Sequence, residues 1–302
     1  MATILNSWSS GVVQRYVDIL TDAGFKAVFG DQRNKDVLID FLNAILPEER
    51  QIKDLEYATT EIPGFALESK SVRLDLRCTG DDGTKFIVEM QRSSQYNFFK
   101  RCVEYAAKVY DSGTSRGGDY DIAPVYFIGI LGEDMKFDRS NPVWKDRYVS
   151  TYNFREKETL EFAEETICIN FVELYRFKKE LKDCRSMVEK WCYSLKHVGK
   201  LQELPKELQI HAFERLFEAC EIAKFSVEKK LQYEKDMITE RDYKNILATA
   251  HDDGFEAGRT EGLAEGKAEG KIEVARTMKA KGLETALIAE LTGLPEEEIM
   301  KA

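Results

Sequence analysis

The sequence predicts an α/β fold in which helices flank a mixed central sheet. Two observations lead to this prediction. Apolar residues recur with helical spacing before and after a group of short predicted strands, and apolar and polar residues alternate within several of those strands. A third is the amount of material available for a core. The chain has 302 residues, of which 43% are hydrophobic and 11% aromatic, which is sufficient for one large domain or two ordinary ones.

The first predicted element is an amphipathic helix at the end of segment 22–46, stopped by Pro47, with apolar residues at Val37, Leu38, Phe41, Leu42 and Ile45. A first strand is expected within 53–62. A hairpin follows, with strands 72–78 (VRLDLRC) and 85–91 (KFIVEMQ) around the turn sequence TGDDG.

A helix at 95–113, ended by Gly113, and a buried strand at 123–132 (APVYFIGILG) complete the predicted order α, β, β, β, α, β. This order describes a meander with a crossover helix to a last strand. Strand-like segments at 148–154 and 167–177 could extend the sheet, and residues 178–248 are expected to be helical. The predicted parts are a core domain at 1–177, a helical region at 178–250 and a tail at 251–302.

The tail has its own pattern, because glycine recurs every four residues at Gly254, Gly258, Gly262, Gly266 and Gly270. Each glycine costs a helix about 1 kcal/mol relative to alanine, so something must compensate if the segment is helical. Two interpretations stay open: self-association through close helix crossing, or a frayed helical linker. The tail ends in a predicted helix-turn-helix element with Gly293 and Pro295 at its turn.

Composition narrows the possible functions. The net charge is −10, which argues against a protein that coats nucleic acid nonspecifically, although a local basic groove is compatible with it. Six cysteines without a C-x-x-C pair and three scattered histidines indicate neither a disulfide framework nor a zinc site, so any metal chemistry must rest on carboxylates. Without a signal-like start or an apolar run of roughly 18 residues, we expect a cytoplasmic location.

The hairpin carries acids inside its strands. If the strands pair about residue 82, Asp75 faces Glu89, Arg73 faces Gln91 and Arg77 faces Ile87. The opposite face would then be a core face, formed by Leu74, Leu76, Cys78, Phe86, Val88 and Met90. Two opposed acids about 5 Å apart repel each other unless a cation lies between them, and Mg²⁺ suits such a pair. A solvated polar face is the alternative interpretation.

Several motifs occur in this order: LTDAGFKAVFG, NKDVLIDFLNAIL, SKSVRLDLRCTGDDGTKFIVEMQ, FFKRCVEYAAKVY, PVYFIGIL, FVELYRF, EKWCYSLKH and the glycine tail ending IAELTGLPEEEI. As a set they resemble the Rpn family of recombination-promoting nucleases, also described as PD-(D/E)XK nuclease family transposases. The resemblance implies a restriction-endonuclease-like core over residues 1–177 and DNA cleavage by metal-activated water, in bacterial recombination, mobile elements or defence.

The resemblance also implies roles for particular residues. Asp75 and Glu89 would bind a divalent ion, Mg²⁺ or Mn²⁺, with Gln91 in the place of the superfamily's lysine. Further candidates for the site are Asp36 and Lys26, together with the cations Lys70, Arg73, Lys100 and Arg101 as replacements for that lysine. Candidate DNA contacts are Arg92, Lys100 and Arg101.

Two alternatives remain open at this point. The substrate could be RNA, since two carboxylates and a metal do not identify the sugar. The chain could be a catalytically weak nuclease-fold scaffold that assembles through its acidic tail. The tail itself predicts a homo-oligomer, although its oligomer number does not follow from the sequence.

Overall fold

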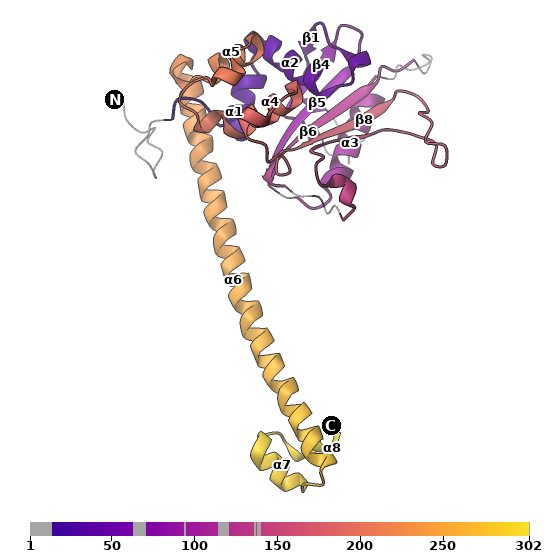
Figure 1. The fold of residues 1–302 in the computed structure, drawn as a ribbon, viewed down its shortest axis with the longest axis vertical. Coiled ribbons are helices and arrows are strands. Elements are labelled where there is room, and N and C mark those ends of the chain that lie inside the picture. The colour runs from indigo at the N-terminus through magenta and orange to yellow at the C-terminus, as the bar shows by residue number, and fades with distance from the viewer. Residues whose placement is uncertain are drawn as a thin grey trace. The chain divides into compact units, whose positions relative to one another are not determined.

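The computed structural model describes residues 14–62, 71–93, 95–113, 121–135, 137 and 140–301. The chain divides into two compact units, Met1–Met237 and Ile238–Ala302. The α-helices are α1 (Asp22–Phe29), α2 (Lys35–Ile45), α3 (Phe98–Asp111), α4 (Met187–His197), α5 (His211–Cys220), α6 (Val227–Ala280), α7 (Thr285–Thr292) and α8 (Glu296–Lys301) (Figure 1).

The centre of the first unit is a six-stranded sheet in the order β1-β4-β5-β6-β8-β7. Its strands are β1 (Leu55–Tyr57), β4 (Leu76–Gly80), β5 (Lys85–Ser93), β6 (Val125–Asp134), β7 (Val149–Tyr152) and β8 (Ile167–Glu173). The pairs β5–β6 and β6–β8 are parallel and the others antiparallel, so the sheet is mixed. A separate two-stranded sheet joins β2 (Glu61–Ile62) to β3 (Val72–Arg73).

Helices cover both faces of the large sheet (Figure 1). On one face, α1, α2, α4 and α5 form the main core, where the ring of Trp191 contacts Phe41 and Phe213 at centroid distances of 5.4 and 5.1 Å. On the other face, α3 packs over Ile87, Phe127 and Phe171 in a second core. The sheet is therefore an internal layer and not a wet surface.

Short 3₁₀ turns connect these elements: Gln32–Asn34, Glu48–Arg50, Pro142–Trp144, Leu181–Asp183, Val198–Lys200, Lys206–Leu208 and Ile222–Lys224. At the hairpin tip, Gly83 takes a φ of 85°, a left-handed conformation that glycine adopts without a steric cost. In β6, Gly129 leaves room for Phe171 of β8, because a Cβ at position 129 would lie 2.7 Å from the Phe171 ring.

The first described residues are bound to a segment far along the chain. The amide of Val17 donates to the carbonyl of Cys220 at 3.0 Å, and Tyr16 forms a β-bridge with Glu221. The amide of Asp18 donates to the hydroxyl of Tyr233, in the first turns of α6, at 3.0 Å. The segment before α1 is thus fixed by residues more than 200 positions later.

The predicted α/β architecture with a mixed sheet and a crossover helix is confirmed. The predicted hairpin register also holds from Leu76, opposite Val88, to Thr79, opposite Lys85. Residues 148–154 and 167–177 do extend the sheet, as β7 and β8. The predicted strand at 53–62 is two short strands in different sheets.

The predicted strand 72–78 is wrong at its start. The backbone leaves the ladder at Leu74 and Asp75, and Arg73 pairs with Glu61 of β2 instead of facing Gln91. Because the strand is interrupted, the alternation of side chains does not continue from β3 into β4. Leu74 therefore lies in the core under α3 with Ile87, whereas Leu76 lies in the main core on the other face of the sheet. The face expected to be polar is covered by α3 as well.

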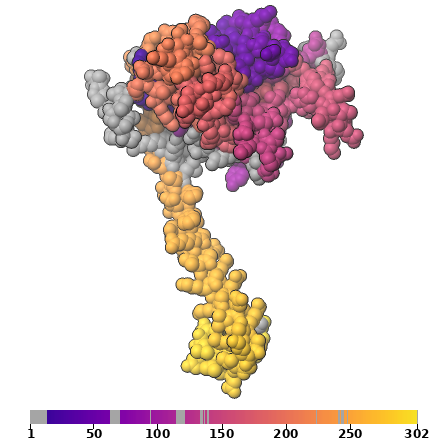
Figure 2. Space-filling view, viewed as in Figure 1, coloured from indigo at the N-terminus to yellow at the C-terminus, as the bar shows by residue number. Residues whose placement is uncertain are grey.

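The second unit contains most of α6, with α7 and α8. Ala275, Ile288 and Ile299 form its small core, and Figure 2 shows the yellow residues of α7 and α8 gathered against the end of α6. Gly293, between α7 and α8, has a φ of 67°. All five repeat glycines lie within α6, and a Cβ built on any of them would have nothing within 4 Å. The predicted three-part division of the chain stays a prediction.

No α-helix in the described ranges is long and apolar enough to cross a membrane.

Candidate metal centre

Asp75 and Glu89 meet at the break between β3 and β4. The backbone amide of Asp75 donates to Glu89 Oε1 at 2.9 Å, and the amide of Met90 donates to Asp75 Oδ2 at 3.0 Å. Each carboxylate therefore accepts a hydrogen bond from the backbone across from it, and these two bonds replace the regular backbone hydrogen bonds between the strands. The break in the strand brings the two acids together.

Both acids lie in a poorly hydrated place. Glu89 is only 6% exposed. Burial, followed by the charge of Asp75, raises the pKa of Glu89 to about 8. Burial also raises the pKa of Asp75, against the hydrogen bond from Met90. Loss of water and mutual repulsion both disfavour the doubly ionised pair, so a bound cation would relieve it.

Two cations and a third acid surround this pair. The charges of Arg101 on α3 and of Lys26 on α1 lower the pKa values of Asp75 and Glu89, whereas the charge of Asp22 raises that of Asp75. Asp22 and Lys26 lie one turn apart on α1 and form an ion pair at 2.7 Å. The site thus lies between helices from opposite faces of the sheet.

The position of α1 depends on its first turn. Thr21 caps the helix by accepting a hydrogen bond from the Gly24 amide at 3.0 Å. A Cβ on Gly24 would lie 1.9 Å from the carbonyl oxygen of Asp18, so only glycine permits the close approach of the preceding segment. This local packing places Asp22 and Lys26 beside the strands.

Gln91 is fixed at both ends of its amide. Its Nε2 donates to the carbonyl of Ser93 at 2.7 Å, and its Oε1 accepts from Arg101 Nη2 at 2.8 Å. The register of β5 against β6 shifts directly after Gln91, an irregularity of the kind that often accompanies functional sites. Gln91 therefore connects the strand of Glu89 to the guanidinium of Arg101.

Arg101 is in turn held by its own helix and by the segment just before it. It also donates to Gln95, and its guanidinium carbon lies 5.0 Å from the ring centroid of Phe98 and 5.7 Å from that of Tyr105. A guanidinium held by two hydrogen bonds and two aromatic rings is a pre-oriented positive charge.

For the other candidate residues, the structure shows different partners or an exposed side chain. Asp36 forms an ion pair with Arg215 of α5 at 2.8 Å, Arg73 lies opposite Glu61, and Arg92 pairs with Asp18 at 3.5 Å. Lys100 is exposed on α3. Lys70 lies outside the described residues.

Asp22 is the charged neighbour that the sequence interpretation missed. The further acid that we predicted for the site was Asp36, on α2, whereas the structure brings Asp22 of α1 within electrostatic reach of Asp75. A signal was available, because the motif LTDAGFKAVFG places Asp22 and Lys26 four residues apart on one helix face.

The donor set fits a hard cation. Mg²⁺ typically takes one or two carboxylates and completes its shell with water and phosphate oxygens. Within the part of the chain that the structure describes, three or more His, Cys, Asp or Glu side chains do not gather into a ready metal cluster. Asp75 and Glu89 would therefore supply two ligands, and the remaining positions would be open to water and substrate.

The sequence profile of the PD-(D/E)XK nuclease family transposases matches residues 19–250, which is most of the chain and includes every candidate residue above. Searches among curated proteins and among solved structures gave no significant match. The order of strands, the crossover helix α3 and the paired acids, one just before β4 and one on β5, are consistent with this family. The chain therefore belongs to the PD-(D/E)XK nuclease family transposases, as its motifs predict.

Proposed function

We propose that the protein is a metal-dependent DNA endonuclease of the Rpn type that hydrolyses phosphodiester bonds. The observation that carries the proposal is the pair of half-buried Asp75 and buried Glu89, whose pKa values are raised and which lie near the cations Lys26 and Arg101. PD-(D/E)XK nucleases generally use divalent metal ions, and we propose Mg²⁺ or Mn²⁺ here.

In this proposal Asp75 and Glu89 bind the ion through carboxylate oxygens. When bound, such an ion polarises the scissile phosphate and lowers the pKa of the attacking water. Gln91 cannot carry the charge of the lysine it replaces, but it binds Arg101 at 2.8 Å. We assign to Arg101 the stabilisation of negative charge on the phosphate, and to Gln91 the positioning of Arg101. Lys26 is a second cation on the opposite side.

The substrate assignment rests on the family and on exposed basic residues. Lys100 is exposed one residue before Arg101, where it can contact a phosphate of the same strand. RNA is the alternative substrate, and matched DNA and RNA oligonucleotides in one assay distinguish the two. Recombination, mobile elements or defence against invading DNA would be the biological setting.

The test uses the purified full chain, supercoiled plasmid, and Mg²⁺ or Mn²⁺. We expect Asp75→Asn and Glu89→Gln to reduce nicking by a factor of about 100 or more, and the exposed control Glu207→Gln to retain it. A second measurement is the rise in melting temperature with added Mn²⁺, which the two site variants should lose. Equal nicking by all of these proteins would mean contamination and would refute the assignment.

A second candidate function is a nuclease-fold scaffold with little catalysis. The observation that favours it is the Gln91 amide, which is already engaged by Ser93 and Arg101. Plasmid binding without any nicking, equal in the wild type and in Glu89→Gln, would support this function.

We also propose that the chain self-associates through the glycine face of α6. The support is the row of five glycines. They leave open space along one side of α6, and each of them lowers the stability of the helix.

A further inference from the structure

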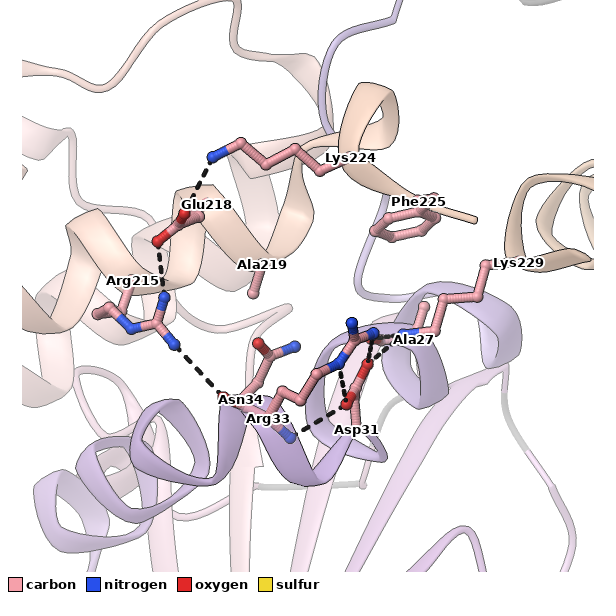
Figure 3. A pocket seen from close by; sticks show the side chains of 10 residues that line it. All are labelled: Ala27, Asp31, Arg33, Asn34, Arg215, Glu218, Ala219, Lys224, Phe225 and Lys229. Atoms are coloured by element: carbon pink, nitrogen blue, oxygen red, sulfur yellow. Dashed lines mark hydrogen bonds and ion pairs between the residues drawn. The ribbon is translucent and has the colours of Figure 1, made fainter. Parts of the chain in front are cut away.

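A second group of charged side chains surrounds a pocket of about 250 Å³ in the first unit (Figure 3). It is lined by residues of the end of α1 and the turn that follows it, of α5, of the turn after α5 and of the start of α6. Its charged lining residues are Asp31, Arg33, Arg215, Glu218, Lys224 and Lys229. The proposed metal centre uses none of them.

The lining carries more positive than negative charge. Asp31 binds Arg33 at 2.7 Å and also Lys229, and Glu218 binds Arg215 at 2.6 Å and Lys224 at 3.0 Å. Each of these acids thus serves two cations, so the six residues have a net charge of +2.

Neighbouring residues reduce this excess without removing it. Asp36 also binds Arg215, at 2.8 Å, and Glu221 lies 3.5 Å from Lys224 and 3.1 Å from Arg15. The larger set, with Arg15 included, keeps one positive charge, whereas the whole chain has a net charge of −10. The pocket is therefore a locally cationic site on an acidic protein.

The two groups of charges are adjacent. Arg215 Nη2 donates to the carbonyl of Arg33 at 3.4 Å. The guanidinium of Arg215, which is paired with Glu218, therefore also contacts the backbone close to Asp31. Figure 3 shows the two groups on either side of the pocket. The side chains of Arg33 and Lys224 are 80% and 53% exposed, and a ligand from solvent can reach both.

The acids keep the cations in place, and they stay ionised. The pKa of Asp31 lies well below its usual range, first because Arg33 donates hydrogen bonds to it. The pKa of Glu218 is lowered by Lys224 and then by Arg215. The ion pairs that position these cations therefore persist throughout the neutral pH range, as an anion-binding site requires.

One wall of the pocket is apolar. Phe225 lies on it, with the ammonium of Lys229 5.6 Å from its ring centroid, and Ala27 and Ala219 are small enough to leave space beside it. Asn34 adds an amide, whose Nδ2 donates to the carbonyl of Val28 at 3.0 Å. An aromatic face, an amide and several cations suit a ligand with a flat polar ring and a phosphate.

We propose that this pocket binds a nucleotide with a terminal phosphate, which lies between the Arg33–Lys229 and Arg215–Lys224 groups while its base lies against Phe225. A volume of about 250 Å³ is below the roughly 300–1,000 Å³ of sites for drug-sized ligands. A single nucleotide is therefore the largest ligand expected. It could be free or be the 5′ end of a strand, since both present the same chemistry.

The test is calorimetric titration of the full chain with dAMP in the presence of a chelator, so that cleavage and metal bridging are absent. We expect saturable binding, weakened by added salt because the contacts are ionic, and no comparable binding of deoxyadenosine or of inorganic phosphate. Arg33→Gln and Lys224→Gln should each weaken binding about tenfold or more. The matched control is Lys53→Gln, at an exposed lysine outside the pocket.

A 5′-phosphorylated oligonucleotide that binds more tightly than dAMP, with the same dependence on Lys224, supports the site and identifies a strand end as its ligand. Three results would overturn the proposal: no saturable binding of dAMP, binding of deoxyadenosine or of phosphate as tight as that of dAMP, or full affinity in both pocket variants. Melting curves of the variants confirm that each is folded. Because Asp75 and Glu89 take no part, the result is independent of the nuclease assay.

Discussion

Among single residues, Asp75 and Glu89 have the most unfavourable electrostatic environment of the proposed site. A carboxyl group whose pKa is raised on folding favours the folded state less and less as the pH rises. For Glu89 this loss begins near the ordinary value of 4.5 and continues to about 8. In metal-free protein, the pair should therefore reduce stability most at the alkaline end of this range.

The first prediction concerns Glu89→Gln. The amide keeps an oxygen that can accept from the Asp75 backbone, but it removes the buried charge. At pH 8 with a chelator, we expect the variant to be more stable than the wild type by at least about 1 kcal/mol, and the gain to shrink toward pH 4.5. Urea denaturation at several pH values measures it. A gain that is constant with pH, or equal in Glu207→Gln, would contradict the electrostatic explanation.

The second prediction concerns Arg101 and Gln91. If Arg101 supplies the charge of the missing lysine, Arg101→Gln should lower the turnover of plasmid about 100-fold, while Lys100→Gln has a small effect. Adding Gln91→Lys to Arg101→Gln should restore part of the rate, because a cation returns to the same place. Initial rates and melting temperatures decide this; no recovery in a stable double variant would argue against the role of Arg101.

The paired acids could be found from the sequence, because the predicted hairpin pairing and the motifs both pointed to Asp75 and Glu89, although the acids meet at a break that this pairing did not include. The choice between Asp36 and Asp22 could not be made in this way. Asp36 is drawn away by Arg215, 179 residues later in the chain, and no local pattern shows such a partner.

At the scale of elements, the turn sequence and the alternation were sufficient for the register of β4 and β5. They did not show the break before β4, because the break depends on β3 pairing with β2 in a second sheet. The burial of Ile87 was missed for a related reason, because the packing of α3 over that face is a tertiary contact that the local sequence does not show. Local sequence predicted the elements, and long-range packing decided where two of them begin.

The third prediction concerns the contact between β6 and β8. Gly129→Ala would place a methyl group 2.7 Å from the Phe171 ring, and this overpacking should destabilise the first unit by about 1–3 kcal/mol. Tryptophan fluorescence during urea denaturation reports on this unit, which contains Trp144 and Trp191. Gly258→Ala is the matched control, since its new methyl group meets nothing within 4 Å. An unchanged midpoint for Gly129→Ala would show that Phe171 can move aside.

At the scale of the whole molecule, the two units differ in what stabilises them. The first has large cores on both sides of a sheet, whereas the second has a small core and a long glycine-containing stretch of α6. Residues 251–302 have 12 acidic and 7 basic side chains, so any association of this part must overcome like charge. Its strength should therefore increase with ionic strength.

The fourth prediction is that light scattering finds a larger mass per particle for the full chain than for a chain ending at Ala250. Gly258→Ala with Gly262→Ala separates the two interpretations of the repeat. It should increase helicity in either case, but it should reduce the mass only if the glycines form the contact. If all three proteins have the same number of chains per particle, the glycine segment is a linker and not a contact.

The bonds between residues 16–18 and residues 220–233 also affect when the proposed metal centre can form. At about 5–20 residues per second, a ribosome needs on the order of 10–40 s to make the intervening chain. Until Cys220 and Tyr233 emerge, the segment before α1 lacks the hydrogen bonds that fix it. Asp22 and Lys26 then have no fixed place beside the acids. Under the proposed function, a growing chain thus carries an unfinished cleavage centre for most of its synthesis, and a fragment released early would leave nearby DNA uncut.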